Sequence, residues 1–122
     1  MKKVFCVLLL FLFMTPFLST CGKEPSQFTL LTYERYLEEF PSDRYMGTIK
    51  NSKDAKQKAL AVWIEVYGKQ VKWKWPYKVS YDLENGAWFV MGTLEFWYDF
   101  GGVPYIIFQE ADGKVLAVWH DK

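Results

Sequence analysis

Few side chains in this sequence could carry covalent or metal chemistry. His120 is the one histidine, and Cys6 and Cys21 are the two cysteines. A nucleophilic site needs a histidine beside a cysteine or serine, and no serine lies in a recognisable nucleophile turn. A metal site would depend on carboxylates almost alone. We therefore expect no metal and no cofactor, and we expect His120 to close a strand by hydrogen bonding.

Carboxylates and tyrosines leave one catalytic alternative. An isomerase of the acid–base type holds an aspartate or glutamate beside tyrosine hydroxyls in an apolar pocket. The residue types are present in Asp82, Glu95, Asp99, Tyr81, Tyr98 and Tyr105. They come from so many positions that the match is easily found by chance. We therefore predict that the protein is not an enzyme and keep an isomerase using a pocket carboxylate as an alternative.

Two short motifs suggest anion binding and are better explained by structure. Gly101-Gly102 lacks the further glycines, the lysine and the following helix of a phosphate loop, so it is expected to turn the chain into a buried strand. The stretch VKWKWPY, residues 71–77, interleaves lysine with tryptophan as binders of single-stranded nucleic acid do. Inward tryptophans and outward lysines also suit an edge strand. We expect that strand and no nucleic-acid partner.

The N-terminus has the pattern of an export signal. Lys2 and Lys3 precede an apolar stretch over residues 4–13, and Pro16 follows it. This stretch is shorter than the roughly 20 apolar residues that a membrane-spanning helix needs. Residues 1–20 are therefore predicted to be a signal peptide.

Cys21 stands where a lipid anchor would be attached. The sequence from Leu18 to Gly22 resembles the bacterial lipobox, although Thr20 replaces the usual glycine or alanine. Residues 21–28 would then be a lipidated tether, with acyl chains such as palmitate on Cys21, and residues 29–122 the folded domain. Removing residues 1–20 takes two of the 15 basic side chains and none of the 14 acidic ones, which leaves a formal charge of −1.

Two helices are expected before the strands. Leu30, Tyr33, Leu37 and Phe40 recur at helical spacing until Pro41. A second helix is predicted between an Asn51 or Ser52 cap and a Gly68 cap. Its buried face is expected to contain the following residues: Ala55, Ala59, Val62, Trp63 and Val66.

The rest of the sequence is typical of an antiparallel sheet. Strands are expected over 71–75, 77–83 and 87–96, with an Asn85-Gly86 turn and a close approach at Gly92. VPYIIFQ, residues 103–109, is apolar on both faces and is predicted to be a central strand. After a turn at Asp112-Gly113, Val115, Ala117 and Trp119 are expected to face away from Leu116 and Val118. The order indicates an α+β fold with N-terminal helices on one face of a bent antiparallel sheet.

Several motifs follow one another in the second half of the sequence: Ala59 with Trp63 and Tyr67-Gly68, Pro76-Tyr77, Trp88 to Leu94, Gly101 to Ile106, Asp112 to Leu116, and His120 to Lys122. The resemblance that these motifs carry, in residues and in order, is to a family of bacterial immunity proteins with the nuclear-transport-factor-2-like, or cystatin-like, cone fold. It implies that the protein binds and neutralises a secreted polymorphic toxin at the cell envelope. It also implies that two copies can pair through their sheets. A cone-fold envelope protein that binds a small apolar ligand remains the other alternative.

A stretch rich in aromatic side chains is the expected toxin contact. One strand cannot bury nearly consecutive aromatic side chains on one side, so some should be exposed beside the carboxylates. The candidate contact residues are Glu95, Phe96, Trp97, Tyr98, Asp99 and Phe100. With Cys21 lipidated, the protein is expected to be an exported lipoprotein anchored in the membrane of the bacterial envelope.

Overall fold

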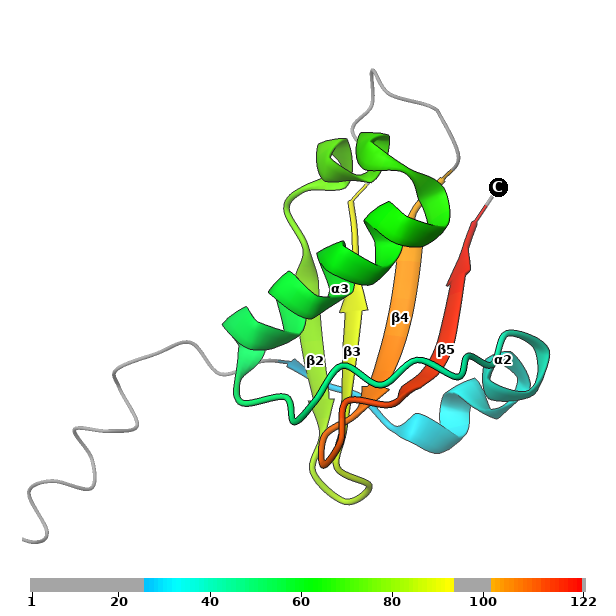
Figure 1. The fold of residues 1–122 in the computed structure, drawn as a ribbon. Helices are drawn as coiled ribbons and strands as arrows, with labels where there is room; N and C mark the ends of the chain where they lie inside the picture. Colours follow the sequence, from blue (N-terminus) through cyan, green and yellow to red (C-terminus); the bar gives the residue numbers. More distant parts are fainter. Residues whose placement is uncertain (1–25, 94–101, 122) are drawn as a thin grey trace, which may run out of the picture.

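A five-stranded mixed sheet is the centre of the fold (Figure 1). The computed structural model describes residues 26–93 and 102–121. The strands lie in the order of the sequence: β1 (Ser26–Gln27), β2 (Lys78–Asp82), β3 (Ala87–Met91), β4 (Pro104–Gln109) and β5 (Val115–His120). β1 is parallel to β2, and the other neighbours are antiparallel. β4 is an inner strand, as its apolar residues on both faces predicted.

Helix α3 (Ser52–Tyr67) covers the first face of the sheet and has the predicted caps. The Asn51 side chain accepts a hydrogen bond from the Asp54 amide at 2.8 Å, and Gly68 ends the helix with a φ of 95°. Trp63 is fully buried and donates from Nε1 to the Tyr105 carbonyl at 3.3 Å. Val66 is 41% exposed, so its predicted burial was wrong.

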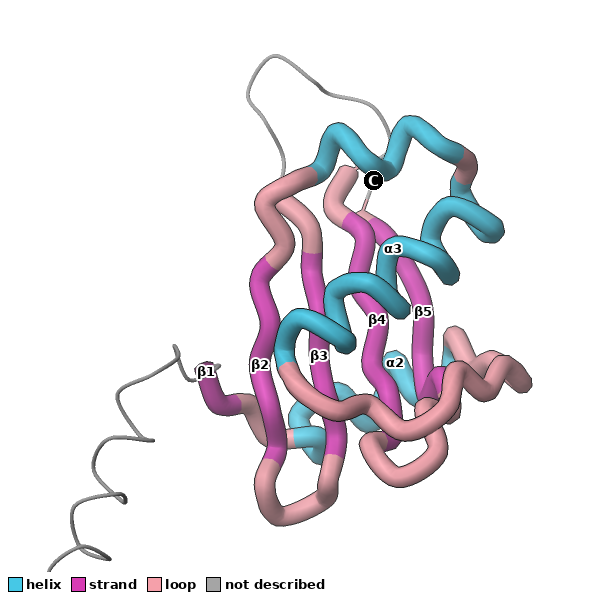
Figure 2. The backbone as a smooth tube through the Cα atoms, turned by 60° about the vertical axis from the view of Figure 1, so that its left-hand side comes forward, coloured by secondary structure: helices cyan, strands magenta, loops and turns pink. Residues whose placement is uncertain are grey.

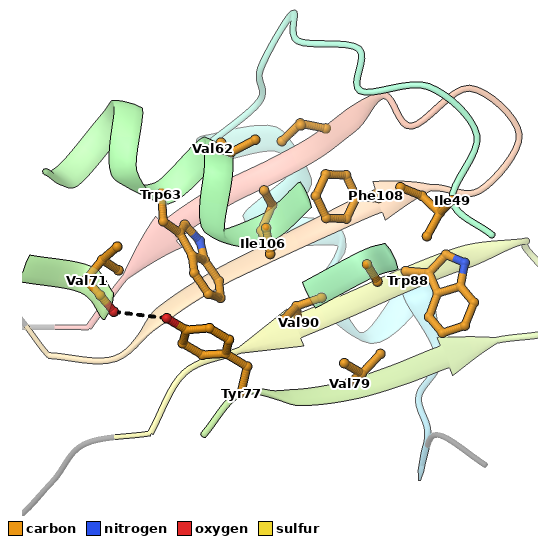
Figure 3. Close-up of a cluster of buried hydrophobic side chains, with 13 residues drawn as sticks. Ile49, Val62, Trp63, Val71, Tyr77, Val79, Trp88, Val90, Ile106 and Phe108 are labelled. Atoms are coloured by element: carbon orange, nitrogen blue, oxygen red, sulfur yellow. Dashed lines mark hydrogen bonds between the residues drawn. The ribbon is translucent and has the colours of Figure 1, made fainter. Parts of the chain in front are cut away.

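The first hydrophobic cluster lies between α3 and the sheet (Figure 3). Its buried members come from α3, from all of β2 to β5 and from the segments beside them: Ile49, Ala55, Ala59, Val62, Trp63, Val71, Tyr77, Val79, Trp88, Val90, Ile106, Phe108 and Val115. Tyr77 donates to the Val71 carbonyl at 3.3 Å and closes one end of the cluster (Figure 3). Burial of these apolar side chains is the main force that holds α3 on the sheet.

The N-terminal helices cover the second face, so the expectation that the helices share one face was wrong. They are η1 (Leu30–Tyr33), a 3-10 helix, and α2 (Glu34–Glu39). Tyr36 stacks on Trp119 of β5 with ring centroids 4.5 Å apart. The second cluster contains Ala87, Phe89, Ile107, Ala117 and Trp119, with Phe28, Leu30, Tyr33, Tyr36, Leu37, Tyr105 and Leu116 packed against them.

A β-bulge in β5 changes which face one residue occupies. Phe108 pairs with Val115 and Ile107 pairs with Ala117, so Leu116 is the extra residue. Val115 therefore belongs to the first cluster, whereas Ala117 and Trp119 belong to the second. The prediction that Val115 shares a face with Ala117 was wrong for this reason.

Residues 69–74 form the 3-10 helix η2 (Lys69–Lys74), so the strand predicted over 71–75 was wrong. Val71 and Lys74 lie three residues apart, and in a 3-10 helix such residues lie on the same side. Both are buried, at 4% and 6% exposure. The buried residues of this segment are therefore spaced by three, as in a 3-10 helix, and not by two, as in the predicted strand.

The folded domain begins earlier than the predicted boundary at residue 29. Ser26 and Gln27 pair with Ser80 and Tyr81 as strand β1. The ring of Phe28 lies 5.4 Å from that of Phe89, between centroids. Residues 26–28, which we expected in the tether, are therefore part of the domain.

Candidate functional site

A cavity of about 250 Å³ opens at the end of the sheet where β4 begins and β5 ends. It lies beside the C-terminus of α3 and beside η2. Its lining is a mixture of apolar and polar side chains: Tyr67, Gln70, Val71, Lys74, Gly102, Pro104 and His120. The cavity is therefore assembled from three separate parts of the sequence.

The aromatic rings of Tyr67 and His120 and the side chain of Lys74 line this cavity. The rings of Tyr67 and His120 meet edge to face with centroids 5.0 Å apart. Burial raises the pKa of the Tyr67 hydroxyl, which stays protonated at neutral pH. His120 is the last residue of β5, pairs with Pro104 and has Nδ1 2.8 Å from the Asp121 carbonyl oxygen. His120 thus ends a strand as predicted.

Both ends of the segment 94–101 are fixed beside the cavity. The Thr93 amide donates to the Lys74 carbonyl at 2.6 Å, and its hydroxyl donates to the Pro76 carbonyl at 2.5 Å. Gly102 has a φ of 67°, and a Cβ there would collide with the Asp121 carbonyl oxygen. Only glycine fits that position. The predicted contact residues Glu95, Phe96, Trp97, Tyr98, Asp99 and Phe100 lie outside the described residues.

The described members of the acid–base alternative do not form one site. Asp82 ends β2, at the opposite end of the sheet from the cavity, and it accepts hydrogen bonds from the Leu30 amide at 2.7 Å and the Asn85 side chain at 2.8 Å. Tyr81 donates to Glu110 at 2.6 Å, which raises the pKa of Tyr81. Each of these polar groups has a structural partner near its own strand end.

Tyr105 also has a structural partner. Its hydroxyl donates to Asp121 at 2.7 Å. Burial and this hydrogen bond raise the pKa of Tyr105 to about 12, so the phenol stays protonated at physiological pH. Glu95, Asp99 and Tyr98 lie outside the described residues. In the described ranges, no three His, Cys, Asp or Glu side chains come together as metal ligands would.

Sequence reasoning missed the cavity and the buried lysine that lines it. Lys74 was expected to point outward from an edge strand, yet it is 6% exposed. The Lys–Trp stretch was the one available signal, and it indicated the wrong secondary structure. No local pattern could join Tyr67, Lys74 and His120, because only the tertiary fold brings them together.

The fold and the comparisons define the class of protein. Two helical layers on a bent sheet make an α+β protein of the cone type, and residues 55–122 match the model of the NTF2 fold immunity protein family. The chain belongs to this family, as its motifs predicted, and immunity is its general function. Comparison with curated proteins and with solved structures gave no match.

Within residues 26–93 and 102–121, no helix combines the length and the apolar character that crossing a bilayer requires.

Asp82 is predicted to stabilise the fold rather than to catalyse. Burial opposes its ionisation, but hydrogen bonds from the Asn85 side chain and the Leu30 amide outweigh burial and lower the pKa of Asp82. Asp82→Asn should reduce the free energy of unfolding by about 2 kcal/mol at pH 7. A group with a lowered pKa stabilises the fold above its unfolded pKa and loses that effect as the pH falls through the folded value. The deficit should therefore shrink in acid.

Urea unfolding between neutral and acid pH measures this difference. The matched control is Asp43→Asn, the same change at an exposed aspartate, which should alter the free energy of unfolding by less than about 0.5 kcal/mol. A deficit in Asp82→Asn that does not change with pH would contradict the role of its charge.

Proposed function

We propose that the protein protects the cell by binding a cognate secreted polymorphic toxin and blocking it stoichiometrically, without catalysis. Membership of the NTF2 fold immunity protein family over residues 55–122 is the observation that carries this proposal. The geometry supports it, because the candidate catalytic groups among the described residues have separate structural partners.

The toxin contacts are proposed to lie in Glu95 to Phe100. The residues on either side of this segment favour the assignment. Thr93 is held by backbone hydrogen bonding and Gly102 by close packing, and both lie at the same end of the sheet. Aromatic side chains supply the large contact area of interface hot spots. Glu95 and Asp99 would attract a basic surface of the toxin and exclude unsuitable partners.

Export and membrane anchoring through Cys21 are part of the proposal. The sequence supports them through the basic start, the short apolar stretch and the lipobox-like residues before Cys21. Such an anchor would hold the protein where a toxin arriving from outside must pass.

The cavity gives little support to the alternative function, the binding of a small apolar ligand. Its volume of about 250 Å³ lies below the roughly 300–1,000 Å³ of most ligand pockets. Its lining also includes the buried Lys74, whose charge does not suit a purely apolar molecule.

Titration of the purified toxin with the protein tests the binding proposal. We expect saturation at a fixed molar ratio, and we expect Trp97→Ala to weaken binding by about 30-fold, the loss typical of an interface hot spot. The control is Tyr45→Ala, at an aromatic side chain that is 61% exposed and whose backbone bridges to Lys114, away from the cavity. It should change the affinity less than threefold. Equal affinities for Trp97→Ala and the unaltered protein would refute the assignment of this segment.

Cell fractionation tests the anchor separately. The Cys21→Ser variant has no thiol to carry a lipid, so it should move from the membrane fraction to the soluble envelope fraction. Cys6→Ser is the matched control and should leave the fractionation unchanged, because Cys6 lies in the predicted signal peptide. Retention of Cys21→Ser in the membrane, to the same extent as the control, would argue against a lipid at Cys21.

A further inference from the structure

The short helix η2 has one buried and one exposed row of side chains. Residues three apart lie on the same side of a 3-10 helix. Val71 and Lys74 form the row that faces the core and the cavity. Lys69 and Lys72 form another row, which is exposed, and Trp75, which is 67% exposed, directly follows the last residue of η2. We call Lys69, Lys72 and Trp75 the η2 ridge.

The η2 ridge belongs to the most basic layer of the protein. Residues 50–78, which include α3 and η2, contain eight lysines and two carboxylates. Residues 26–40, which include η1 and α2, contain three glutamates and one arginine. The sheet separates these layers, because α3 and α2 lie on its opposite faces (Figure 2). Positive charge therefore gathers on one side of the protein.

We propose that the η2 ridge rests on anionic lipid headgroups. Lysines near an anionic bilayer surface are attracted to it, and tryptophan favours the headgroup level, where its apolar ring and its N–H group both find suitable surroundings. The ridge offers both side-chain types within seven residues of the sequence. This inference goes beyond toxin binding, and its biological setting rests on the proposed export and anchoring.

The path of the chain allows the anchor and the ridge to reach one membrane plane. Trp75 lies five positions before Ser80, which pairs with Ser26 of β1. Cys21 lies five positions before Ser26. Five residues span at most about 18 Å of extended chain. A lipid on Cys21 would thus hold Ser26 within about 18 Å of the bilayer. Trp75 is separated from Ser80, the partner of Ser26, by the same length of chain, so the ridge can reach the same bilayer.

Other occupants fit the ridge less well. Binders of single-stranded nucleic acid stack successive bases on several aromatic side chains along a groove. Here Tyr77, the next aromatic residue after Trp75, is 9% exposed and belongs to the first cluster. Protein interfaces are depleted in lysine, whereas lysine supplies two of the three ridge residues.

Vesicle partitioning tests the proposal without the lipid anchor. The full chain carrying Cys21→Ser is titrated with vesicles of phosphatidylcholine alone and of phosphatidylcholine with about one third phosphatidylglycerol. We expect stronger partitioning into the anionic vesicles, and we expect added salt to weaken it. Residues 1–25 are the same in every variant, so their contribution cancels in each comparison.

Variants of the ridge give the decisive comparison. Lys69→Gln/Lys72→Gln should lower partitioning into anionic vesicles by about 30-fold, the factor expected for two surface lysines, and should leave partitioning into neutral vesicles unchanged. Trp75→Ser should weaken binding to the anionic vesicles and leave its salt dependence intact. Arg35→Glu is the matched control: it makes the same change of net charge in the acidic layer, where the Arg35 side chain is 80% exposed. It should have less than a threefold effect.

Three results would overturn the proposal. Equal losses in the lysine variant and in Arg35→Glu would mean that net charge alone determines the binding. Tighter binding to a single-stranded oligonucleotide than to anionic vesicles, lost in the lysine variant, would assign the ridge to nucleic acid. A loss of toxin affinity in Trp75→Ala with no preference for anionic vesicles would assign it to the toxin. The protein in this assay carries no lipid and meets no toxin. A failure of the ridge to bind anionic vesicles is therefore distinguishable from a failure of the lipid anchor or of toxin binding.

Discussion

The constraint on which the rest of the structure depends is the apolar character of β4 on both faces. Ile106 and Phe108 point into the first cluster and Ile107 into the second, and all three have no measurable exposure. An inner strand of this kind must be covered twice, because each uncovered face would leave large apolar side chains in water. Helix α3 supplies one cover, and η1 with α2 supplies the other.

The family match includes most of the first cover, α3, and none of the second cover, η1 with α2. The family match begins at residue 55, inside α3, and runs through β5, so it contains strands β2 to β5 and most of the first cover. The second cover lies before the matched residues. The cavity opens at the end of the sheet where β4 begins and β5 ends, and Thr93 and Gly102 fix both ends of the proposed contact segment at that same end. Thr93 and Gly102, which flank the proposed toxin contact segment, thus lie at the edge of the part of the fold that matches the family.

Local chemistry made much of the fold predictable from the sequence. The Asn51 and Gly68 caps, the inner position of β4 and the turn at Gly113 depend on nearby residues or on simple alternation. The face chosen by the N-terminal helix was not predictable, because an amphipathic pattern shows that a face is buried and not what covers it. The η2 stretch was misjudged because Val71 and Lys74 are spaced for a 3-10 helix. The cavity could not be foreseen, since its lining residues meet only in the tertiary structure.

The central claim is protection by binding, and the survival of cells tests it most directly. The proposed cognate toxin is expressed in the compartment where it acts, with and without the protein. Cells should survive when folded protein is present at or above the molar amount of toxin, and killing should return once toxin is in excess. Unchanged killing in the presence of abundant folded protein would contradict the claim.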